Sequence, residues 1–264
     1  MKKTLTLLSA CMLIALFSCT KPSGVEVTQH FPITKNYYRL YISDGMKVTV
    51  TNQVDDIVIT ADENVMEKIN VEFRNGDLKI YRRDFSIFRL MKAEVLIPYN
   101  YGLHDLDVES YSSFTSSYGI EGDDIKVTIK NFSDVDVNYI QANELKLNLD
   151  DNSDFVGDLS VMDFLDLYIN RSDVELTGDA TNVRLNMSEN SEFIERWGSQ
   201  GGYSFACDYC YGTMRHNCIA YFHCYDKIAV DLTDNSFLHC TGEPDIDDST
   251  WDDTSCIMFD DYNK

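Results

Sequence analysis

The sequence of 264 residues has few prolines, few basic residues and, beyond its N-terminus, no long apolar run. Four prolines and 13 glycines, with 12% aromatic residues, exclude a collagen-like or low-complexity chain. No segment after the first twenty residues approaches the roughly 18 consecutive apolar residues of a membrane-spanning helix. The 22 Lys and Arg oppose 44 Asp and Glu, a net charge of −22 that is unsuited to the phosphates of nucleic acid. We therefore predict a folded protein that does not bind nucleic acid.

The motifs of common enzyme classes are absent as well. The sequence contains no G-x-S-x-G nucleophile turn, no H-E-x-x-H metal motif and no glycine-rich phosphate or dinucleotide loop. We therefore predict a non-catalytic protein that needs no cofactor.

The first residues have the pattern of an export signal. Lys2 and Lys3 precede 14 residues, 4–17, that suit the apolar core of a signal peptide and are too few to span a bilayer. Residues 16–19, Leu-Phe-Ser-Cys, resemble a bacterial lipobox. The sequence thus predicts a signal peptide over residues 1–18 and a lipidated Cys19, which anchors the protein in a membrane.

Two alternatives to this lipobox exist. Residues 8–11, Leu-Ser-Ala-Cys, match a lipobox too, but about five apolar residues precede them, fewer than a signal core needs. An ordinary secretory peptide with a chance cysteine is the other. Thr20, which replaces the Asp that retains some lipoproteins in the inner membrane, favours the outer membrane, on its periplasmic face or at the cell surface. Residues 19–30 then contain the lipidated cysteine and a tether.

From Leu106 onward, a pattern of alternating apolar residues, a polar turn and a serine recurs about every twenty residues. One copy runs from Ile125 to Ser133, and the next from Leu145 to Ser153. The serines of the repeat are Ser113 in a weaker first copy, then Ser133, Ser153, Ser172, Ser191 and Ser236. The gap from 191 to 236 leaves room for one more, longer coil. The apolar residues two positions after the serines, which we expect in the core, are Val135, Phe155, Val174, Phe193 and Leu238.

Alternation predicts short strands with one buried face, and a fixed period predicts that they stack. We therefore predict an all-β fold, a single-stranded parallel β-helix (β-solenoid) with coils of about 20 residues. A Greek-key or sandwich arrangement and a leucine-rich repeat are the alternatives. The second fits Leu147-x-Leu149-x-x-Asn152 but not the polar residues that follow.

The N-terminal part resembles a known family. A strand pattern with Gly45 and Val48-x-Val50 precedes the turn Ala61-Asp-Glu-Asn, then Gly76-x-Leu-x-Ile and Val95-x-Ile-Pro98. This order is similar to the head GIN domain family of Bacteroidetes lipoproteins, known as auto-transporter adhesins. The resemblance implies a right-handed β-helix in the cell envelope and an adhesin-like function. The resemblance covers roughly Phe31 to Phe193, with an N-terminal β part at 31–105 and regular coils at 106–197. Residues 198–264 depart from the family pattern, and we assign them to Cys- and aromatic-rich C-terminal coils with a cap.

An acidic residue follows most of the repeated serines: Asp134, Asp154, Asp173 and Glu192. Equivalent positions of adjacent coils lie about 4.8 Å apart, so these carboxylates form a stripe. Such a stripe either stays hydrated or binds Ca²⁺, which prefers oxygen ligands. We treat calcium as a weak candidate and the hydrated turn as the main interpretation.

Six cysteines gather near the C-terminus: Cys207, Cys210, Cys218, Cys224, Cys240 and Cys256. In an exported protein an even number favours disulfides, and Cys218 and Cys240, about one coil apart, are expected to face each other. Inert buried thiols and zinc ligation are other interpretations, and a redox Cys207-x-x-Cys210 is disfavoured because its flanks are predicted as strand.

Aromatic residues share this stretch: Tyr203, Phe205, Tyr209, Tyr211, Tyr221, Phe222 and Tyr225. They fill the end of the solenoid or, where exposed, stack on sugar rings. We predict a binding or structural module of the envelope, with a glycan or envelope protein as partner. The alternative is a carbohydrate-active β-helix enzyme, which requires a cleft where carboxylates converge on one lateral face.

Overall fold

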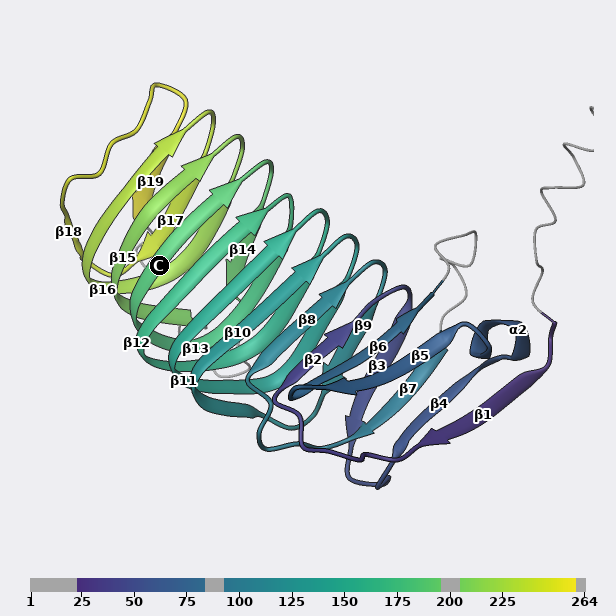
Figure 1. Cartoon of the computed structure of the whole chain (residues 1–264). Helices are drawn as coiled ribbons and strands as arrows, with labels where there is room; N and C mark the ends of the chain where they lie inside the picture. The colour runs from purple at the N-terminus through teal and green to yellow at the C-terminus, as the bar shows by residue number, and fades with distance from the viewer. Residues whose placement is uncertain (1–22, 84–92, 196–204, 260–264) are drawn as a thin grey trace, which may run out of the picture.

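The computed structural model describes residues 23–83, 93–195 and 205–259. They form one sheet of 19 strands, wound into a β-solenoid of about seven turns (Figure 1). The structure is 69% strand and 2% helix, which confirms the predicted all-β solenoid with coils of about 20 residues. The predicted signal peptide, Cys19 and the first part of the tether lie outside the described residues.

The first strands and the one helix of the described chain are β1 (Glu26–Phe31), β2 (Arg39–Ile42), β3 (Met46–Thr51), β4 (Ile57–Asp62), α2 (Glu63–Met66), β5 (Ile69–Arg74), β6 (Asp77–Arg82), β7 (Ala93–Pro98), β8 (Asp105–Glu109) and β9 (Ser113–Ser116). The later strands are β10 (Ile120–Lys130), β11 (Asp134–Asp150), β12 (Asp154–Asn170), β13 (Asp173–Ser188), β14 (Glu192–Glu195), β15 (Phe205–Arg215), β16 (Ile219–Thr233), β17 (Phe237–Thr241), β18 (Asp245–Ile246) and β19 (Cys256–Phe259).

Each regular coil has three straight segments separated by corners. In β11 the pairing with β12 breaks register between Val137 and Tyr139 and again between Ala142 and Glu144. The third and longest segment forms what we call the long face, made of residues 124–130, 144–150, 164–170, 182–188, 209–215 and 227–233. Because side chains alternate along each strand, one set fills the interior and the other covers the outside.

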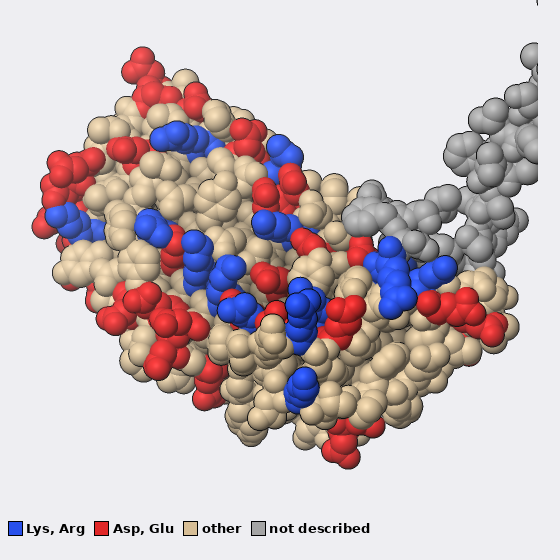
Figure 2. Space-filling model, in the orientation of Figure 1, with Lys and Arg blue, Asp and Glu red and all other residues tan. Residues whose placement is uncertain are grey.

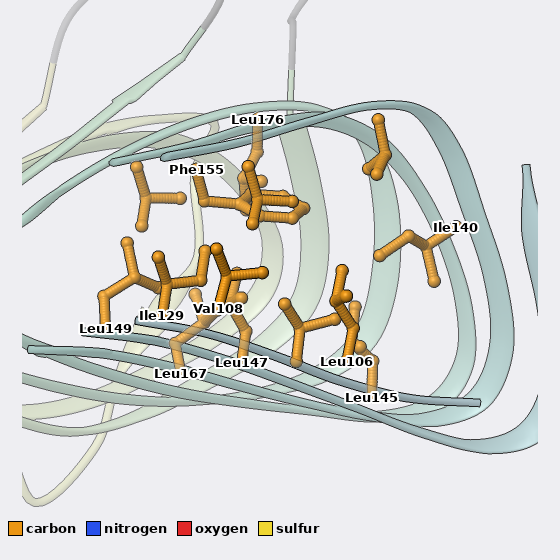
Figure 3. Close-up of a cluster of buried hydrophobic side chains, with 14 of the residues drawn as sticks. Leu106, Val108, Ile129, Ile140, Leu145, Leu147, Leu149, Phe155, Leu167 and Leu176 are labelled. Atoms are coloured by element: carbon orange, nitrogen blue, oxygen red, sulfur yellow. The ribbon is translucent and has the colours of Figure 1, made fainter. Parts of the chain in front are cut away.

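The interior is a continuous apolar column. Leu145, Leu147 and Leu149 of the long face point toward Phe155 and Leu176 on the opposite wall (Figure 3), and all five are at most 1% exposed. The core positions predicted after the serines, Val135, Phe155, Val174, Phe193 and Leu238, are likewise at most 1% exposed, as predicted.

The N-terminal end of the solenoid is closed by antiparallel strands. β1 pairs with β4 and β4 with β7, while β5 pairs with β6, all antiparallel. Parallel pairing begins with β2 and β3, so coils start well before residue 106. The coil of β2 and β3 lies between the two later coils, β6–β7 on its outer side and β8–β9 on its inner side.

The turn between coils has a left-handed backbone at one or two residues, such as Asp151 and Asn152 with φ of 55° and 59°. Asn and Asp tolerate this conformation better than other non-glycine residues. A buried serine follows most of the turns, and Cys218 takes its place at one of them: the serines are Ser112, Ser133, Ser153, Ser172, Ser191, Ser236 and Ser255. The backbone N–H of Ser172, for example, donates to Oγ of Ser191 at 3.3 Å.

Two of these turns differ from the repeat that the sequence predicted. The first copy was predicted at Ser113, but Ser113 pairs with Asp134, and the residue equivalent to Ser133 is the buried Ser112. The extra coil predicted between residues 191 and 236 is present. Its turn carries Cys218, whose backbone N–H donates to Oγ of Ser236 at 3.3 Å. Strands β15 to β19 therefore continue the same solenoid.

Candidate binding groove on the long face

The outward side chains of the long face form straight rows, because adjacent coils pair in register. One row crosses the sheet through Arg39, Asp105, Lys126, Lys146, Asp166, Arg184 and Tyr211. Figure 2 shows this face, with Lys and Arg side chains in its middle and Asp and Glu beside them. The acidic chain thus presents a surface of mixed charge here.

A groove of about 750 Å³ runs along this row. Its walls come from the loop before β8 and from β8, β10, β11, β12 and β13. The lining residues are Tyr101, Gly102, His104, Asp105, Glu121, Gly122, Asp123, Asp124, Ile125, Lys126, Glu144, Leu145, Lys146, Phe164, Asp166 and Arg184. This site was not predicted from the sequence, although its charged residues Lys126, Lys146, Asp166 and Arg184 occupy positions between the apolar residues of the repeat.

Ion pairs fix the floor of the groove. The guanidinium of Arg184 donates to both carboxylate oxygens of Asp166, with Nε to Oδ1 at 2.8 Å, and Lys146 Nζ lies 3.8 Å from Oδ2. At the other end, Arg39 Nε lies 2.8 Å from Asp105 Oδ2. Asp166 is only 9% exposed, and its two cations supply the compensation that a buried carboxylate requires.

Aromatic rings adjoin the ion pairs. Arg184 lies over the ring of Phe164, 5.5 Å from its centroid, and the rings of Phe164 and Tyr211 are 6.1 Å apart. Tyr168, two residues after Asp166 on the same face, is 47% exposed. Flat rings beside fixed charges are the elements that bind the faces and hydroxyl groups of sugars.

The groove also contains the convergent carboxylates that the enzyme alternative requires. Several are already engaged: Asp166 and Asp105 in ion pairs, Glu121 by the hydroxyl of Tyr139, and Asp123 by Nδ2 of Asn143 at 3.1 Å. Asp124 and Glu144 pair in register on adjacent coils and both line the groove.

The predicted acidic stripe is assembled as expected, because Asp134, Asp154, Asp173 and Glu192 pair in register on four successive coils. Partial burial, then repulsion from Asp134, Asp173 and Glu175, raises the pKa of Asp154. Burial, then repulsion from Glu175, raises the pKa of Asp173. Within the described ranges, no three His, Cys, Asp or Glu side chains gather as a metal site would require. Calcium binding to the stripe stays a prediction.

The cysteines of the C-terminal coils are free thiols in this structure. The expected contact between Cys218 and Cys240 is wrong, because Cys240 pairs with Phe222 and Cys218 adjoins Ser236. Cys207 pairs in register with Cys224 instead. Cys207, Cys210, Cys218, Cys224 and Cys240 are at most 2% exposed, whereas Cys256 is partly exposed. The zinc interpretation also stays a prediction, with no cluster of metal ligands among the residues described.

The C-terminal aromatic residues divide between the two predicted roles. Phe205 and Phe222 are at most 2% exposed and stack around Phe193 in the core. Tyr209 and Tyr211 lie on the long face and are 41% and 38% exposed. Tyr225 is exposed, Tyr221 is half-buried against His239, and Tyr203 lies outside the described residues.

Stacked parallel coils, an antiparallel end and a polar lateral groove define a β-solenoid protein with a side surface suited to binding. The chain belongs to the family described as "Putative auto-transporter adhesin, head GIN domain", whose sequence profile matches residues 36–194. The resemblance seen in the sequence is thereby confirmed, and with it an adhesin-like class associated with the cell surface or envelope.

Solved structures share the fold at low identity. A "Putative lipid binding protein" of Parabacteroides distasonis has a TM-score of 0.74 and 13% identity, covering 91% of this chain and 98% of its own. A "putative adhesin" of the same species has a TM-score of 0.67 and 12% identity, covering 90% and 96%. Another "putative adhesin", from Parabacteroides merdae, has a TM-score of 0.61 and 13% identity, covering 92% and 99%.

The search of functionally curated proteins found no match to this chain. None of the described helices is long and apolar enough to cross a membrane. The sequence profile establishes the family, and the structure establishes the fold. Neither of them points to a catalytic function.

Proposed function

We propose that the protein is a lipid-anchored, non-catalytic binding module of the outer membrane that binds an oligosaccharide along the long-face groove. The groove itself is the main observation in support. It is open, crosses several coils, and combines fixed ion pairs with the ring of Phe164 and the neighbouring Tyr211. Because adjacent coils repeat about every 4.8 Å, an extended polymer would meet similar rows of polar groups along its length.

An acyl chain is a poorer fit than a sugar. Lipid tails require a large apolar cavity, whereas the solenoid interior is filled by side chains such as Phe155 and Phe193, which are fully buried. The apolar cavity between Tyr37, Val50 and Phe114 measures only about 10 Å³, less than a ligand needs. The lipid-binding description of the structural neighbour is therefore not transferred to this chain.

A hydrolytic function is the second candidate, and Asp124 and Glu144 are the observation that favours it. Their backbones pair in register, about 4.8 Å apart, which is comparable with the roughly 5–5.5 Å between the carboxyl groups of a retaining glycosidase. The same binding experiment separates the two functions, because cleavage releases new reducing ends from the bound glycan.

The proposal is tested by screening the full-length protein, extracted in mild detergent, on an array of neutral and uronic-acid-containing oligosaccharides. We expect saturable binding without product release. Phe164→Ala and Arg184→Ala should each weaken binding about tenfold or more, roughly 1.4 kcal/mol, because they remove the ring or the cation. The measurement is a titration of the best glycan by calorimetry.

Arg171→Ala is the matched control. Arg171 is half-exposed at a turn, where Nη1 binds Asp151 at 2.8 Å, and it lies off the groove. The Arg171→Ala substitution removes one positive charge, as Arg184→Ala does, and should leave the affinity for the glycan unchanged. An array without any binder, or equal losses in Arg171→Ala and Arg184→Ala, would refute the groove as the binding site. Release of reducing ends that stops in Asp124→Asn or Glu144→Gln would establish the enzyme instead.

A further inference from the structure

Four buried thiols lie near one corner of the last coils: those of Cys207, Cys210, Cys224 and Cys240. Cys207 ends the short middle segment of its coil and Cys210 is the second residue of the long face, with the corner between them. Cys207 pairs in register with Cys224 on the next coil, and the Cys224 thiol donates to the backbone carbonyls of Asp208 at 3.4 Å and Lys227 at 3.3 Å. Cys207 is 2% exposed and Cys224 is fully buried.

Earlier coils have aliphatic residues at this position. The column runs through Ala142, Val161 and Ala180 before it reaches Cys207 and Cys224. In the last two coils of this column, cysteines replace the aliphatic residues, and the two cysteines pair with each other in register. Backbones of paired parallel strands lie about 4.8 Å apart, within the Cα separation of roughly 4.4–6.8 Å that a disulfide spans.

We propose that Cys207 and Cys224 form a disulfide in the exported protein, which links two consecutive coils of the solenoid. The two thiols lose two protons and two electrons, one S–S bond forms, and the electrons reduce a disulfide donor such as oxidised glutathione or a thiol–disulfide oxidoreductase of the envelope. The inference rests on the export that the proposed function includes, because such donors act in oxidising compartments.

The register singles out this pair. Cys210 pairs with Ile228, Cys240 with Phe222, and Cys218 adjoins Ser236, so none of these three has a cysteine opposite it. The pairing of β15 and β16 shifts register directly after Cys207, and a bulged strand can adjust its spacing at that point. Such an adjustment brings the Cβ atoms into the range that the bond requires.

The bond must form before the coils close. Contact with the Cys210 thiol, together with burial, raises the pKa of Cys207. Contact with the Cys207 thiol, followed by burial, raises the pKa of Cys224. Because the thiolate is the reactive form, the folded dithiol resists oxidation, and exchange proceeds while the C-terminal coils are still docking.

The test has two arms. Full-length protein from the cell envelope, and protein unfolded with reductant and refolded with a mixture of reduced and oxidised glutathione, are each alkylated in denaturant without reductant. We expect four of the six C-terminal cysteines to be alkylated in both, and a peptide map with the 207–224 cross-link. Reduction should lower the melting temperature by about 5–10 °C, since the bond constrains the unfolded chain.

Cys224→Ala should abolish the cross-link, whereas Cys218→Ser, which places at that turn the residue found in the other coils, should retain it. Six free thiols in the refolded protein, or a bond mapped to Cys207 and Cys210, would overturn the proposed pair and leave the proposed function untouched. A cross-link in the refolded protein with six free thiols in the cellular protein would instead contradict export to an oxidising compartment.

Discussion

The buried serine after each turn solves a local hydrogen-bonding problem. One or two residues with left-handed backbone reverse the chain, and the next N–H enters the interior, where no water is available. Oγ of Ser172 accepts from the N–H of Ser153 at 3.2 Å and donates to the carbonyl of Asn170 at 2.9 Å. A small hydroxyl with both functions fits where a larger polar group would not.

Ser172→Ala tests this role. The substitution removes both hydrogen bonds and leaves the buried N–H of Ser153 without its acceptor, so we expect a loss of about 1–3 kcal/mol in the free energy of unfolding. Urea denaturation followed by circular dichroism measures it. Cys218→Ser, which keeps a side chain that can bond to the carbonyl of Arg215, should change stability little. A neutral Ser172→Ala would show that the ladder contributes nothing.

Glycine solves a different local problem at Gly178. Its φ is 97°, and a Cβ there would lie 1.9 Å from the carbonyl oxygen of Leu159 on the preceding coil. The close approach of two backbones at this corner therefore requires a residue without a side chain.

At the scale of the elements, the sequence predicted which residues of each strand face inward, but it did not predict the register in which adjacent coils pair. Apolar residues at every second position in 145–149 and 165–169 predicted inward-facing strands, and the fixed period predicted stacking. The choice between Ser112 and Ser113 depended on a one-residue shift that the pattern could not resolve. The pairing of Cys207 with Cys224 depended on a coil of 17 residues (224 − 207), shorter than the repeat of about 20 that the pattern predicted.

The N-terminal end was less predictable for a topological reason. β6 and β7 follow β2 and β3 in sequence but stack on their outer side, while β8 and β9 stack on the inner side. A repeat search assumes that successive coils are neighbours, and that assumption fails here. The groove was missed because its rows combine charges from several coils and depend on the same register.

The acidic stripe makes the free energy of unfolding of the solenoid depend on pH. The pKa of Asp154 is raised in the folded protein, so the folded state binds a proton more tightly than the unfolded state. The ionised carboxylate therefore destabilises the fold at neutral pH. This penalty disappears as the pH falls from the raised pKa toward the ordinary value of 3.8.

We therefore expect Asp154→Asn to be more stable than the native protein at pH 7, in the presence of a chelator, with a difference that shrinks toward pH 4. Urea denaturation at several pH values measures the difference. Asp136→Asn is the control, since Asp136 is exposed and its in-register neighbours are Thr115 and Val156. A native protein that gains stability with Ca²⁺, while Asp154→Asn does not, would show that the stripe binds calcium.

At the scale of the whole molecule, charge is graded along the solenoid. Residues 1–100 contain 13 Lys and Arg and 11 Asp and Glu, whereas residues 101–264 contain 9 and 33. The coils advance from β1 at one end to β19 at the other (Figure 1), so the acidic part lies away from the N-terminal end. Only three residues lie between Cys19 and Ser23, so the four Cα–Cα steps reach at most about 14 Å. An anchor on Cys19 would thus hold the less charged end at the membrane and extend the acidic coils and their groove outward.

This arrangement makes membrane attachment depend on the lipid. Anionic headgroups repel a chain with a net charge of −22, so attraction has to come from acyl chains in the bilayer. We expect the native protein to incorporate labelled palmitate and to sediment with membranes, resisting high salt but released by detergent. Cys19→Ala should lose the label and move to the soluble fraction with an unchanged circular dichroism spectrum. Cys11→Ala is the matched control and should keep both label and attachment. Loss of label in Cys11→Ala would assign lipidation to the earlier cysteine, and a Cys19→Ala protein that still requires detergent would refute the proposed anchor.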